Sequence, residues 1–146
     1  MTLKQVINRI QGIAENHGML KSFYQGDPWE LEHQERGHTE YACLLLQMTA
    51  VSLQKGQTRL DFSFYFMDQV TAEEHNELDV LSDMLQVAQD VVAQLRDPVY
   101  EDWLVSDTNS GVFFVERFES STAGLRVDVA VIIEDPGDRC AVPANV

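Results

Sequence analysis

A strand–turn–strand pattern near the end of the chain constrains the fold more than any other feature. Residues 112–134 contain two apolar runs separated by Ser-Ser-Thr-Ala-Gly. A period of two after a glycine-ended turn predicts a β-hairpin over 112–134 with one buried face. In the second run, Arg126 and Asp128 belong to the polar face. The apolar face consists of Leu125, Val127, Val129, Val131 and Ile133.

An earlier segment has the same character and predicts a first hairpin over residues 41–68. The apolar run 41–53 leads into Gln-Lys-Gly-Gln, and alternation resumes over 58–68. Its second strand places four large residues on one face, and we expect these to pack in the core because an isolated hairpin is marginal in water. The acidic character of the chain disfavours the alternative, a platform for stacking nucleic-acid bases. The four residues are Leu60, Phe62, Phe64 and Phe66.

Two stretches show helical rather than strand periodicity. Apolar residues recur at helical spacing near the start, which predicts an amphipathic N-terminal helix within residues 1–18. A longer helix is predicted over 71–96, because Thr71 and Glu74 have capping-box spacing and Asp97-Pro98 ends the apolar periodicity. The polar half of that helix carries Asp79, Asp83 and Asp90.

The order of these elements predicts a single α+β domain over residues 1–146. We expect an antiparallel sheet of two hairpins packed against the N-terminal helix and the long central helix. Residues 21–38 lack periodicity and are predicted to form an exposed loop with brief strand pieces, and 135–146 a C-terminal arm. A chain of 146 residues is long enough to support one core of its own.

The charge balance limits the partners. The chain has 24 acidic and 10 basic residues and a net charge of −14, so it would be repelled by phosphates. Three readings stay open: a charge that serves solubility, an acidic surface along which DNA passes without sticking, and a mimic of DNA. The two cysteines, Cys43 and Cys140, match no metal or redox spacing. The sequence also shows no signal-peptide pattern and no apolar run of membrane-spanning length. Together these features favour a soluble protein of a reducing compartment.

No signature of catalysis or metal binding stands out, so we expect no enzyme and no cofactor. His33 and His38 lie five residues apart, but no further ligand completes a metal pattern, which favours a solvated loop. Asp61 and Glu116 are expected on strands, where a cross-strand pair with Arg117 explains them as well as catalysis does. The chain contains no phosphate-binding glycine loop and no nucleophile elbow.

The element order resembles that of tail-terminator or tail-completion proteins of tailed bacteriophages, over nearly the whole chain. The most similar local stretch is residues 113–131, with its Phe-x-x-x-Phe and Ala-Gly-Leu-Arg-Val-Asp-Val sequences. Residues 30–38 have no counterpart. The resemblance implies a structural virion protein, assembled in the host cytoplasm, that forms a ring, commonly six-fold. Such a ring stops growth of the tail tube and joins the tail to the neck, so its partners are other copies of itself, tail-tube protein and neck or connector protein.

The resemblance also suggests which residues serve assembly. A channel that carries DNA should not bind phosphate, so acidic residues are expected at the lumen or at a subunit interface: Asp79, Asp83, Asp90, Asp128 and Glu134. A turn and an arm are expected to contact neighbouring subunits: Ser121, Thr122, Gly124, Asp135 and Pro136. The competing interpretations are another head–tail connector or neck protein, an acidic DNA-mimic inhibitor, and a small enzyme with a carboxylate pocket.

Overall fold

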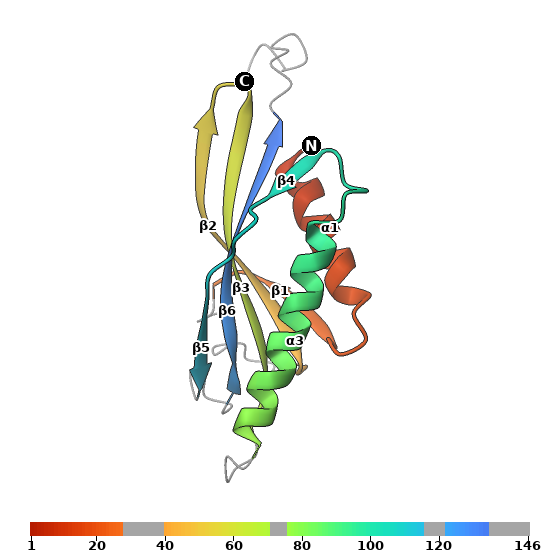
Figure 1. The fold of residues 1–146 in the computed structure, drawn as a ribbon, viewed down its shortest axis with the longest axis vertical. Coiled ribbons are helices and arrows are strands. Elements are labelled where there is room, and N and C mark those ends of the chain that lie inside the picture. Colours follow the sequence, from red (N-terminus) through yellow and green to blue (C-terminus); the bar gives the residue numbers. More distant parts are fainter. Residues whose placement is uncertain (28–39, 71–75, 116–121, 135–146) are drawn as a thin grey trace.

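The computed structural model of the protein describes residues 1–27, 40–70, 76–115 and 122–134, and within them a sheet dominates (Figure 1). Strand residues make up 45% of this part and helical residues 29%, so the helices are a layer on a larger sheet. The helices are α1 (Leu3–Glu15) and α3 (Glu77–Leu95). The strands are β1 (Ser22–Gln25), β2 (Cys43–Gln54), β3 (Gln57–Gln69), β4 (Trp103–Val105), β5 (Gly111–Val115) and β6 (Thr122–Glu134).

Three long strands, β2, β3 and β6, form the centre of the sheet. The strand order is β1-β2-β3-β6-β4, and β5 pairs with another part of β6. The pairs β2–β3 and β3–β6 are antiparallel, and Phe64 of β3 lies opposite Leu46 on one side and Val127 on the other. The β2–β3 turn contains Gly56 at φ +81°, a left-handed conformation that glycine adopts without steric cost. Both predicted hairpins are therefore present as strand pairs.

The predicted fold class is nevertheless wrong. The sheet is mixed, because β1 runs parallel to β2 with Phe23 opposite Leu44, and six strands replace the expected four. β1 has only four residues, none of them buried, so it carries no alternation that would distinguish it from the loop predicted over 21–38. β4 has only three residues, which are too few to show an alternating pattern, so the sequence did not predict it as a strand. The structure is thus not an antiparallel sheet of two hairpins packed against helices.

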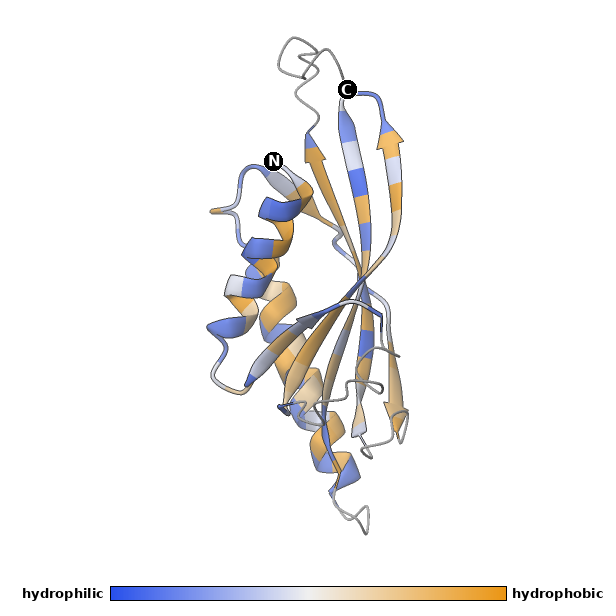
Figure 2. Ribbon diagram, turned by 180° about the vertical axis from the view of Figure 1, so that it is seen from behind, coloured by the Kyte–Doolittle hydropathy of each residue, from blue (hydrophilic) through white to orange (hydrophobic). Residues whose placement is uncertain are grey.

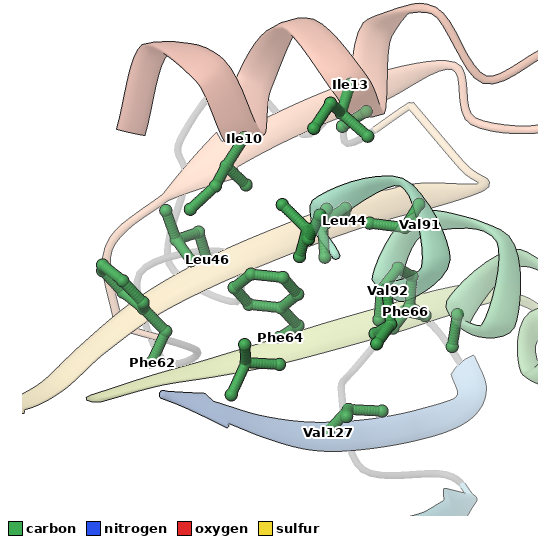
Figure 3. Close-up of a cluster of buried hydrophobic side chains, with 14 of the residues drawn as sticks. Ile10, Ile13, Leu44, Leu46, Phe62, Phe64, Phe66, Val91, Val92 and Val127 are labelled. Carbon is green, nitrogen blue, oxygen red and sulfur yellow. The ribbon is translucent and has the colours of Figure 1, made fainter. Parts of the chain in front are cut away.

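The main core lies between one face of the sheet and the two helices (Figure 3). Phe62, Phe64 and Phe66 are 0–2% exposed, which confirms the predicted aromatic stripe. Ile10 and Ile13 point toward the stripe from α1, and α3 adds its own buried face. The apolar face predicted for residues 125–133 is confirmed, since all five of its side chains are buried. We call this side of the sheet the helix face.

The opposite face of the sheet has a smaller core, so part of the sheet is buried on both sides. Cys43, Leu45, Tyr65, Met67 and Phe114 pack together there. This explains why Cys43 to Leu46 are all buried and read as a continuous apolar run rather than an alternating one. Cys43 behaves as the predicted small hydrophobic residue, and its burial raises the pKa of its thiol to about 12.

One arginine joins the middle of α1 to the segment that leads into β4. Arg9 donates to both carboxylate oxygens of Asp102 at 2.7 and 2.8 Å. Its guanidinium carbon lies 4.4 Å from the ring centre of Tyr100 and 4.7 Å from that of Trp103. The hydrogen bonds and charge of Arg9 hold the pKa of Asp102 below its ordinary value. At its own start, α1 is closed by a capping box between Thr2 and Gln5.

Candidate assembly interface

The acids predicted for a lumen or subunit interface lie in separate places. Asp79 and Asp83 are exposed on the solvent side of α3. Asp90, also on α3, lies 3.0 Å from Nε2 of His17. Because Nδ1 of His17 accepts from the backbone N–H of Met19 at 3.1 Å, its Nε2 carries the hydrogen and donates to Asp90. Asp90 therefore joins α3 to the end of α1.

The other two predicted acids are on β6. Asp128 lies on the face opposite the helices, where it accepts from Oγ of Ser63 at 2.7 Å and lies 3.5 Å from Nε of Arg126. Glu134 is exposed at the last position of β6, opposite Gln57. The fold thus distributes the five acids over the helix layer, the opposite face of the sheet and the end of a strand, and does not gather them into one acidic surface.

Two residues of the predicted inter-subunit turn belong to a strand. β6 begins at Thr122, so Thr122 and Gly124 are strand residues, and both are buried within the chain. Gly124 lies so close to β3 that a Cβ there would overlap the carbonyl oxygen of Phe66. Neither residue is therefore available on an exposed turn. The remaining three positions of this prediction, Ser121, Asp135 and Pro136, lie outside the described residues, as do the Thr71–Glu74 capping box, His33 and His38.

Part of one sheet edge has no strand partner among the described residues. β1 pairs with β2 only between Cys43 and Leu46, and among the described strands none pairs with the outer side of residues 48–54. We call residues 48–54 the distal β2 segment. Figure 1 shows the joined ends of β2 and β3 extending past both helices. Backbone N–H and C=O groups along such an edge are free to pair with another strand.

The distal β2 segment also exposes large apolar side chains on the helix face. Met48 lies opposite Phe62 and Val51 opposite Leu60, two residues of the helix-face core. A bulge between positions 48 and 50 brings Val51 and then Leu53 back to that face after the strand changes register. Their exposed fractions are 48% for Met48, 58% for Val51 and 83% for Leu53.

A second exposed apolar surface lies at the other edge of the sheet. A groove of about 390 Å³ runs between α3 and β5, and we call it the α3–β5 groove. Leu85 and Gln89 line it from α3, and Phe113, which is 54% exposed, lines it from β5. At one end Arg96 donates to the carbonyl of Ser106 at 3.1 Å and to Oδ1 of Asn109, so its charge is engaged within the chain. The strand beside the groove, β5, pairs with β6 and with no other described strand.

The open face of the sheet carries a polar groove of about 660 Å³. Its charges are arranged as neighbours of opposite sign: Nε of Arg59 donates to Asp61 at 3.0 Å, and Arg126 lies beside Asp128. Each pair joins residues two apart on one strand, so neither is the cross-strand pair expected for Asp61. The partners expected for Asp61, Glu116 and Arg117, lie outside the described residues. Among the described residues, no group of three or more His, Cys, Asp or Glu side chains has the arrangement of a metal site.

Comparison with known proteins adds no identity to this geometry. No family model matches the chain, and no curated protein matches it. Within the part of the chain that the structure describes, no helix is both long and apolar enough to span a membrane.

The sequence does not predict that the distal β2 segment is exposed, because its exposure depends on which part of the sheet the helices cover. The sequence predicts residues 41–53 as one apolar strand of the first hairpin, but only the first part of β2 is buried. The hydropathy colouring in Figure 2 shows apolar bands continuing along β2 past the helices. One signal was present in the sequence: residues 47–54 contain no charged side chain, although the chain as a whole is strongly acidic.

Proposed function

We propose that this protein is a structural protein of a tailed-phage virion, a ring-forming tail terminator that caps the tail tube and joins it to the neck. The observation that carries the proposal is the distal β2 segment, an exposed strand edge lined by Met48, Val51 and Leu53. Proteins that work as monomers commonly protect such edges with charged residues or proline, and residues 48–54 contain neither, although a bulge lies between Met48 and Ala50. An edge that ends in exposed apolar residues is instead suited to contact another subunit.

The two exposed apolar surfaces favour a ring over a two-fold dimer. The distal β2 segment and the α3–β5 groove belong to different elements and have different shapes. A surface pair of this kind supports head-to-tail contacts, which generate a closed ring when the rotation between subunits closes. A two-fold dimer would instead join one surface to a copy of itself.

The charge of the chain agrees with a channel for DNA. Asp79 and Asp83 are exposed on α3 and have no ion pair with another described residue. They lie on a different side of the helix from Leu85 and Gln89, which line the groove. We therefore assign Asp79 and Asp83 to the lumen, where they repel the phosphates of passing DNA. Asp90 and Asp128 have partners within the chain, so we do not assign them to the lumen.

Two experiments test the proposal in sequence. Electron microscopy of the purified protein is expected to show rings of about six subunits with a central opening wide enough for duplex DNA. Co-expression with a tail-tube protein is then expected to give tubes that carry a ring at one end. Rings that leave tube ends bare but bind the neck would identify another connector protein. A monomer that competes with DNA for a basic protein would contradict the proposal and identify a DNA mimic.

A further inference from the structure

We propose that the distal β2 segment of one copy adds as a strand to β5 of the next copy and seats its apolar side chains at the α3–β5 groove. The occupant of the groove is thus a second copy of this chain. This inference rests on the proposed ring and deepens it, because it names the two surfaces that make each contact.

The absence of charge on both strands is the first argument. The distal β2 segment reads Met-Thr-Ala-Val-Ser-Leu-Gln and β5 reads Gly-Val-Phe-Phe-Val, and neither contains a charged residue. Nearly a quarter of the chain is charged, so two copies meeting elsewhere would often bring acids together. Exposed edge strands are commonly guarded by charged side chains, particularly lysine. Two strands without charge on one strongly acidic molecule can therefore meet without bringing acids together.

The strand directions supply the second argument. β2 runs antiparallel to β3, and β3 runs antiparallel to β6, so β2 and β6 point the same way. β5 is antiparallel to β6 and therefore opposes β2. A neighbouring copy whose strands point the same way, and which is turned by the rotation that closes the ring, brings its β5 antiparallel to the distal β2 segment, with the helix faces of both sheets on one side. Strand addition then satisfies backbone groups of both edges.

The side chains fit this arrangement. In the joined sheet Met48, Val51 and Leu53 lie on the helix face, which is the face on which Phe113 lies opposite Leu125. Leu85 of α3 stands over that side of the groove. The contact would thus cover exposed apolar side chains of both copies at once. Because the two surfaces differ, a copy that uses one of them keeps the other free, and the contact repeats from copy to copy.

A mixing experiment with two edge-blocking substitutions tests the inference. Val51→Lys places a charge on the distal β2 segment, and Phe113→Lys places one on β5. Each variant alone is expected to be monomeric by light scattering and native mass spectrometry, with the circular dichroism of the folded protein. Their equimolar mixture is expected to form dimers and nothing larger, because one intact edge meets one intact groove and the blocked surfaces stop growth.

The matched control is Val99→Lys, since Val99 is 72% exposed and belongs to neither surface. This variant is expected to assemble like the wild type. Val51→Lys or Phe113→Lys proteins that still form rings, or a mixture that stays monomeric, would overturn the assigned contact and leave the ring itself standing. A wild-type protein that is monomeric at all concentrations would overturn the ring and the contact together.

Discussion

At the scale of single residues, Gly124 determines how closely β3 and β6 approach. A Cβ there would overlap the carbonyl oxygen of Phe66 and lie 2.9 Å from Cα of Met67, both backbone atoms that cannot swing aside. We expect Gly124→Ala to lower the free energy of unfolding by about 3 kcal/mol, the upper range for overpacking. Gly12→Ala in α1 is the control, because nothing lies within 4 Å of its Cβ position. It should raise stability by about 0.5–1 kcal/mol, as measured by urea unfolding. Equal effects at both positions would contradict the close approach.

The ion pair between Arg9 and Asp102 gives stability a defined pH dependence. The pKa of Asp102 is lowered in the folded protein, so its contribution is present above the ordinary aspartate pKa and is lost as the pH falls through the lowered one. Asp102 is half exposed, which limits the expected loss in Asp102→Asn to about 0.5–1 kcal/mol at pH 7. Denaturant titrations of the two proteins should differ most above about pH 4 and converge as the pH falls through the lowered pKa of Asp102. A difference that persists at pH 2 would show that the charge pair is not responsible.

The thiol of Cys43 is expected to be inert in the folded protein. Its side chain is fully buried, and its pKa of about 12 leaves almost no thiolate at pH 8. In a Cys140→Ser background, a colorimetric disulfide reagent should therefore react with Cys43 only after denaturant is added. Rapid reaction under native conditions would mean that the smaller core opens readily on this face of the sheet.

At the scale of elements, the sequence predicts those strands in which an apolar face alternates with a more polar one. Phe62, Phe64 and Phe66 alternate with more polar neighbours, and the same alternation in β6 correctly identified its buried face. The parallel strand β1 could not be found this way, since its four residues are short of a full pattern and are held by backbone pairing with β2. The interpretation of Gly124 as a turn residue failed because glycine also permits close packing within a strand.

The candidate interface was less accessible to sequence reasoning than the fold. Hydropathy identifies Val51 and Leu53 as apolar, but only the arrangement of the helices shows that nothing described covers them. The α3–β5 groove joins residues separated by more than twenty positions, so no local pattern contains it. The sequence correctly placed Asp79 and Asp83 on the polar side of α3. It could not show that Asp90 and Asp128 have hydrogen-bond partners elsewhere in the chain.

At the scale of the whole molecule, the net charge of −14 has a testable role in the proposed ring. If Asp79 and Asp83 face the lumen, replacing both by lysine changes a repelling surface into an attracting one. The Asp79→Lys/Asp83→Lys ring is expected to retain duplex DNA at low salt and to release it as salt rises, while the wild type does not bind. The control is Glu101→Lys/Asp107→Lys, which makes the same change in net charge at two other exposed acids. Equal DNA retention by both variants in a filter-binding assay would remove the lumen assignment.

The central claim is that the exposed edge and the groove make this protein a ring subunit. The most direct measurement is the mass of the purified wild-type protein in solution, by light scattering or native mass spectrometry over a wide range of concentration. The account predicts a closed species of about six 16.6-kDa chains that does not grow further as concentration rises. A monomer, or a two-fold dimer that survives Val51→Lys, would contradict it.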